Sequence, residues 1–148
     1  MNPSASSRAA AGALLSLAGL AGLACTEPFS PRPLAGLYAM VALNDVAPPR
    51  TLAPNFVVVA DTLQLGVDGR GTWTSVRDTT PAGAAPLPLA TQSIVVRVAH
   101  RNGTTWLDFV DQCTGVQDCV ARYPLTAVAD GLIVDVDPAI FRFLRVAP

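Results

Sequence analysis

Short runs of Val, Ile, Leu and Thr alternate with polar residues along the chain from about residue 37 onward. Clusters of Gly, Pro, Asn and Asp separate these runs. Alternation with a period of two is typical of β-strands that bury one face. The pattern predicts about eight strands, near residues 37–43, 56–66, 71–77, 93–101, 104–110, 121–129, 132–137 and 140–146.

Three dipeptides that favour tight turns join neighbouring runs: Asp68-Gly69, Asn102-Gly103 and Asp130-Gly131. Such dipeptides supply the backbone conformations that short β-hairpin turns require. A two-residue turn at Asn102-Gly103 places apolar side chains on one face and opposite charges on the other. It predicts the pairs Val96–Phe109, Arg97–Asp108 and Val98–Leu107, with Arg97 and Asp108 on the outward face.

The other two turns also predict registers. A two-residue turn at Asp130-Gly131 pairs Leu125 with Val136 and Ala127 with Val134. At Asp68-Gly69, a three-residue turn from Asp68 to Arg70 places Trp73 opposite Leu65, whereas a two-residue turn would place it opposite Gln64. The hydrophobic pattern favours the longer turn.

Consecutive hairpins predict an all-β fold, an antiparallel up-and-down meander of about eight strands. A meander of this size can close into a small barrel, which removes exposed sheet edges. A two-sheet β-sandwich is the alternative. Residues 78–92 form a connector rich in Pro and Ala, and loops of this length are often functional or mobile.

Composition supports one globular domain without extensive helix. The chain has 148 residues, of which 51% are hydrophobic and 14% charged. Its ten basic residues are all Arg and ten of its eleven acids are Asp, so helix-favouring Lys and Glu are nearly absent. The net charge of -1 provides no overall basic field, so we expect no nucleic-acid partner.

Residues 1–24 have the layout of a signal peptide: Arg8 precedes an uncharged run from 9 to 24. This run is shorter than the roughly 20 residues that a membrane-spanning helix needs. The segment Leu20-Ala21-Gly22-Leu23-Ala24-Cys25 resembles the cleavage region of bacterial lipoproteins. The resemblance implies that Cys25 is lipidated and becomes the first residue of the mature protein. Cleavage by an ordinary signal peptidase, which would release a soluble protein, is the alternative.

Residues 25–35 contain three prolines, which predicts an extended tether between Cys25 and a domain spanning 36–148. Removing Cys25 from the count leaves Cys113 and Cys119. In an exported chain this pair predicts a disulfide that closes a short loop. A redox or metal pair is the alternative, although the spacing is not Cys-x-x-Cys and a single His cannot complete a zinc site.

The order of elements resembles small bacterial lipocalin-like domains. Gly36-Leu37-Tyr38 opens the first strand, a Pro-containing loop and a strand with an Asp-Gly turn follow, and arginines occur in the last strand. The resemblance implies a barrel in which a late arginine, Arg142 or Arg145, lies against the aromatic ring of Tyr38.

Catalytic chemistry finds little support. His100, the only histidine, lies beside a predicted turn without a recognisable nucleophile motif. Asp135 and Asp137 share a strand face, which predicts an outward charged row rather than a metal or acid–base site. We therefore expect no enzyme activity, no metal and no cofactor.

The function expected from these observations is that of an exported, lipid-anchored cell-envelope protein that binds a small apolar molecule. Its cavity would be lined by Tyr38, Trp73, Phe109 and Phe141. Its partners would be the membrane, through lipid on Cys25, and that ligand. The alternative is an interaction module with a filled core, which would contact another envelope protein through residues 78–92 and the loop between the two later cysteines.

Overall fold

The computed structural model describes residues 29–110 and 121–146, and most of this part of the chain is β-strand. Cys25, Cys113 and Cys119, and the expected signal peptide, lie outside the described residues. No helix within the two described ranges is long and apolar enough to cross a membrane. The elements are η1 (Arg32–Leu34), β1 (Gly36–Leu43), β2 (Arg50–Ala53), β3 (Phe56–Leu65), β4 (Arg70–Asp78), β5 (Ala90–Arg101), β6 (Thr104–Phe109), β7 (Ala121–Val128), β8 (Gly131–Val136) and β9 (Ala139–Arg145).

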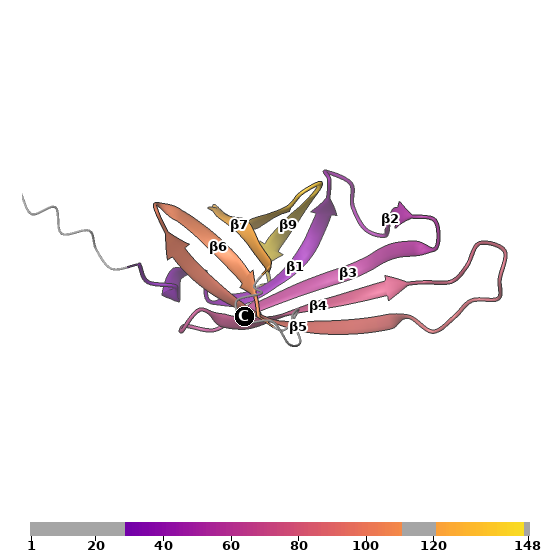
Figure 1. Ribbon diagram of the computed structural model, residues 1–148, viewed down its shortest axis with the longest axis horizontal. Helices are drawn as coiled ribbons and strands as arrows, with labels where there is room; N and C mark the ends of the chain where they lie inside the picture. The colour runs from indigo at the N-terminus through magenta and orange to yellow at the C-terminus, as the bar shows by residue number, and fades with distance from the viewer. Residues whose placement is uncertain (1–28, 111–120, 147–148) are drawn as a thin grey trace, which may run out of the picture.

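The strands form a closed antiparallel barrel (Figure 1). From β3 to β9 each strand pairs with its neighbour in the chain, and β1 closes the barrel by pairing with both β9 and β3. The predicted eight-stranded meander barrel is therefore confirmed, and the sandwich alternative is excluded. The four-residue strand β2, which was not predicted, is an additional strand beside β3.

The three predicted hairpins are present, but only one has the predicted register. Around Asn102-Gly103 all three predicted pairs form. The register at Asp130-Gly131 was wrong, because the turn lies at Ala129-Asp130 and Leu125 pairs with Val134. The register at Asp68-Gly69 was also wrong, because the three-residue turn comprises residues 67–69 and Trp73 pairs with Leu63. Both errors are shifts of two residues, so the inward and outward faces are still those predicted.

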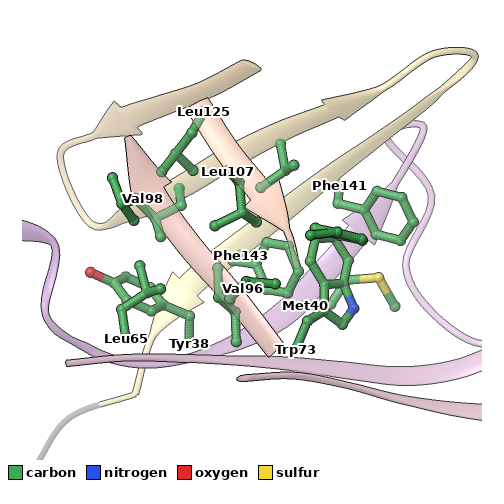
Figure 2. Packing of buried hydrophobic residues seen from close by; sticks show 14 of the residues in the cluster. Tyr38, Met40, Leu65, Trp73, Val96, Val98, Leu107, Leu125, Phe141 and Phe143 are labelled. Atoms are coloured by element: carbon green, nitrogen blue, oxygen red, sulfur yellow. The ribbon is translucent and has the colours of Figure 1, made fainter. Parts of the chain in front are cut away.

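The inward side chains form a filled core in the middle of the barrel. Trp73 packs edge-on against Phe109, Phe141 and Phe143, with ring centres 5.0–5.3 Å apart. Figure 2 shows Trp73 and Phe141 beside Met40 at one end of the cluster and Tyr38, Leu65 and Val98 at the other. The buried hydrophobic residues are Tyr38, Met40, Leu43, Val58, Leu63, Leu65, Trp73, Val96, Val98, Leu107, Phe109, Leu125, Leu132, Val134, Phe141 and Phe143.

Residues 31–35 cover one end of the barrel, which we call the η1 end. The Tyr38 hydroxyl donates a hydrogen bond of 2.8 Å to the carbonyl of Leu34. Arg145, rather than Arg142, lies over the Tyr38 ring and donates to the carbonyl of Pro33. Arg142 instead pairs with Asp45 on the surface. Part of the segment expected to be a tether is thus hydrogen-bonded to the barrel.

Candidate functional site

A hollow of about 230 Å³ lies at the other end of the barrel, which we call the open end. The ends of β4, β6 and β8 and the beginnings of β3, β5, β7 and β9 bring its side chains together. In Figure 1 the strands β3, β4 and β5 extend past β1, β6, β7 and β9 at this end. The open-end hollow is lined by Phe56, Trp73, Ser75, Arg77, Gln92, Ile94, Phe109, Tyr123, Val136 and Phe141.

Three of the four predicted cavity residues, Trp73, Phe109 and Phe141, line this hollow. They form its floor, because their rings also pack into the filled core. Tyr38 is separated from them and lies at the η1 end, where it lines a different surface hollow of about 440 Å³. The structure therefore does not bring all four residues into one cavity.

Arg77 is the only charged residue that lines the open-end hollow among the described residues. Its Nη1 atom donates a hydrogen bond of 2.7 Å to Oδ1 of Asp61. Its guanidinium carbon lies 5.7 Å from the centre of the Phe56 ring, a cation–π geometry. Neither Nε nor Nη2 donates a hydrogen bond to a described residue, and the side chain keeps 17% of its surface exposed. The guanidinium therefore has donors left for another acceptor.

Asp61 is the buried partner that holds Arg77 in place. Its carboxylate also accepts a hydrogen bond from the Ser75 hydroxyl, whereas Oδ2 is buried without a hydrogen-bond partner. Burial raises the pKa of Asp61 above its ordinary value of 3.8, because removal from water disfavours the charged form. Hydrogen bonds from Arg77 and Ser75 oppose this rise without cancelling it.

The sequence interpretation did not identify Asp61, Ser75 and Arg77. Ser75 and Arg77 follow Trp73 at intervals of two residues along β4. The alternation that places Trp73 inward therefore places them inward as well. That alternation was the available signal. Asp61 gave the same signal, because it lies at intervals of two from the buried residues Leu63 and Leu65 along β3.

The other candidate residues lie away from the hollow. His100 is exposed next to the β5–β6 turn, at the η1 end, where its Nδ1 atom is 3.1 Å from Oγ1 of Thr105. Asp135 and Asp137 are exposed. Within the described ranges there is no group of three or more His, Cys, Asp or Glu residues that could hold a metal ion.

The hollow can therefore bind by apolar contact and by hydrogen bonding, with aromatic walls and one guanidinium. It is smaller than the roughly 300–1,000 Å³ typical of sites for drug-sized molecules. Its size suits a small molecule or one end of a longer one. No protein-family model, curated protein or solved structure matches this chain.

Proposed function

We propose that this chain is an exported, non-enzymatic cell-envelope protein whose lipocalin-like barrel binds a small, largely apolar molecule in the open-end hollow. The observation that carries the proposal is the combination of aromatic walls with the unused donors of Arg77. The ligand would place its apolar part against Trp73, Phe109 and Phe141. A hydrogen-bond acceptor on the ligand would reach Arg77.

We further propose that lipid on Cys25 anchors the protein, as the resemblance to lipoprotein cleavage regions implies. Phe29 stacks on His100 at the η1 end, with ring centres 4.9 Å apart. Four residues of extended chain span at most about 14 Å, so a lipid on Cys25 would hold the η1 end close to a membrane surface. The open-end hollow would then point away from the membrane.

Binding in the hollow can be tested with the fluorescent probe anilinonaphthalene sulfonate, which has an apolar ring system and one anionic group. Gln92 lines the hollow, and Thr91 precedes it on the outward face of β5; both are exposed. We expect Gln92→Trp to weaken probe binding at least about tenfold by filling the hollow, which corresponds to about 1.4 kcal/mol. Thr91→Trp is the matched control and should bind like the parent chain. Equal binding by both variants would contradict the proposed site.

The anchor and the native ligand need separate measurements. A Cys25→Ser chain expressed in a bacterium should lose fatty-acid labelling, and unchanged labelling would refute the anchor. Native mass spectrometry of the exported chain should show an added mass that leaves on denaturation. Reduction should add two protons if Cys113 and Cys119 form the expected disulfide.

An interaction module is the second candidate, and two observations favour it. The middle of the barrel is filled by the packing around Trp73. In addition, the β4–β5 connector extends beyond the barrel in Figure 1 and exposes Leu87 and Leu89. A chain that binds no probe and carries no ligand mass, but captures another envelope protein through Leu87 and Leu89, would favour this function.

A further inference from the structure

Arginines gather on one outer face of the barrel, away from the open-end hollow. The strand registers place Arg70 of β4 opposite Arg97 of β5, Arg97 opposite Asp108 of β6, and Asp108 opposite Arg122 of β7. These four residues form one row across four neighbouring strands. Arg101, four residues after Arg97 on the same face of β5, also reaches Asp108. We call Arg70, Arg97, Arg101 and Arg122 the arginine patch.

Asp108 neutralises only part of this charge. Its carboxylate is fully buried beneath three arginines, at nitrogen–oxygen distances of 2.9 Å to Arg122, 3.5 Å to Arg97 and 3.6 Å to Arg101. Asp108 lies on the outer face opposite Arg97, as predicted, but the arginines cover it. Asp68, whose Oδ1 atom accepts a hydrogen bond of 3.0 Å from the backbone N–H of Arg70, is a second nearby acid. Among the described residues, two carboxylates against four guanidinium groups leave a local charge of about +2, although the chain as a whole carries -1.

The patch is exposed to solvent, and two of its arginines lie directly opposite each other. The side chains of Arg97, Arg101 and Arg122 remain 51%, 45% and 39% exposed. Arg70 lies directly opposite Arg97 and forms no ion pair with a described residue. Like charges at directly opposite positions destabilise a strand pair. A bound anion would remove this repulsion.

Apolar side chains accompany the arginines on this face. Trp106 is half-buried and lies two residues before Asp108 on the outer face of β6, opposite Ala99. Val95 and Val110 are exposed and, with Arg70 and Arg97, line a hollow of about 260 Å³. Tryptophan, exposed aliphatic side chains and arginine together are typical of surfaces that lie at a membrane interface.

We propose that the arginine patch binds the anionic head groups of a phospholipid membrane. The charge supplies the attraction, and Trp106, Val95 and Val110 supply apolar contact at the head-group level. The orientation of the patch toward the membrane rests in part on the proposed lipid anchor. Arg101 directly follows His100, the residue on which Phe29 stacks. A lipid on Cys25 would bring this end of β5 to the surface, and the patch would add a second, electrostatic contact.

Vesicle co-sedimentation tests the proposal without the lipid. The probe is the mature chain with Cys25→Ser, mixed with vesicles of phosphatidylcholine alone or of equal parts phosphatidylcholine and phosphatidylglycerol. We expect binding to the anionic vesicles alone, weakening as the salt concentration rises. Arg70→Gln should weaken it about fivefold, and Arg70→Gln combined with Arg97→Gln about 25-fold, since each basic residue near an anionic surface contributes about 1 kcal/mol.

Arg142→Gln is the matched control, because it removes the same charge from β9, where the arginine pairs with Asp45. It should change vesicle binding less than twofold. Equal binding to both vesicle types, or equal losses for Arg70→Gln and Arg142→Gln, would overturn the proposal. So would binding of free glycerol phosphate without binding of vesicles. Fatty-acid labelling of Cys25 is read independently, so a failed patch and a failed anchor give different results.

Discussion

The guanidinium carbon of Arg145 lies 5.3 Å from the centre of the Tyr38 ring, and its Nη2 atom donates a hydrogen bond of 2.7 Å to the Tyr38 hydroxyl. Residues from the first and last strands of the barrel are thereby joined. The same two side chains hold the carbonyls of Leu34 and Pro33. The contact therefore fixes the segment that covers the η1 end.

Tyr38→Phe should lower the free energy of unfolding by about 1–2 kcal/mol. The change removes a buried hydroxyl that both donates and accepts a hydrogen bond, and it leaves the Leu34 carbonyl without its donor. Urea unfolding measures the effect. Arg142→Gln, which removes only an exposed ion pair, should cost less than about 1 kcal/mol. Equal losses would mean that the Tyr38 contact does not stabilise the barrel.

Gly131→Ala tests the corrected β7–β8 register. A Cβ atom at Gly131 would lie 1.9 Å from the carbonyl oxygen of Phe143, so β8 and β9 would have to separate. Gly103 is a turn residue with φ +79° and open space around it, so Gly103→Ala should cost about 1–2 kcal/mol of backbone strain. We expect a larger loss in thermal unfolding for Gly131→Ala. Equal losses would instead support a turn at Asp130-Gly131.

These glycines show why the fold could be predicted and two of its registers could not. Asn102 and Gly103 both have positive φ, as the two-residue turn requires, and there the prediction is confirmed. Gly131 lies within β8, where it permits close approach of β9 instead of forming a turn. An Asp-Gly dipeptide does not distinguish these two uses. The inside–outside pattern is insensitive to the error, because a shift of two residues keeps each side chain on its face.

The floor of the hollow could be predicted in the same way, whereas the ion pair between Arg77 and Asp61 could not. Trp73, Phe109 and Phe141 follow from the alternation of apolar residues. Val58 and Asp61 both lie inward although strict alternation would place them on opposite faces, because the register of β3 shifts between them. A bulge of this kind leaves no mark in the hydrophobic pattern. Asp61 itself keeps the phase of Leu63 and Leu65, so alternation places it inward, but its contact with Arg77 depends on the register of β3 against β4 and is visible only in the folded barrel.

The contribution of Asp61 to the stability of the barrel should fall as the pH rises through the ionisation of this carboxyl. The folded state raises the pKa of this carboxyl above 3.8, so it binds the proton more tightly than the unfolded chain does. The difference in unfolding free energy between the parent chain and Asp61→Asn should therefore decrease as pH rises above about 3.8.

Both effects can be measured by urea unfolding between acidic and neutral pH. Asp78→Asn is the control, because the contribution of Asp78 to stability should change with pH in the opposite direction. Hydrogen bonds from Thr80 hold the pKa of Asp78 below 3.8. Its contribution is therefore present above that value and is lost as the pH falls. Relative to Asp78→Asn, the parent chain should gain stability with rising pH. The same trend for both variants would contradict the assignment of the Asp61 effect to burial.

Trp73→Ala separates the two proposed functions, because Trp73 belongs both to the core and to the floor of the hollow. Removing a buried aromatic side chain costs about 3–5 kcal/mol, and we expect a loss of that size in urea unfolding. Trp106→Ala, on the outer face, should cost less. If the hollow binds the ligand, Trp73→Ala should also change affinity for anilinonaphthalene sulfonate under conditions where the variant is still folded. A stability loss with unchanged probe affinity would leave Trp73 as a packing residue only and favour the interaction module.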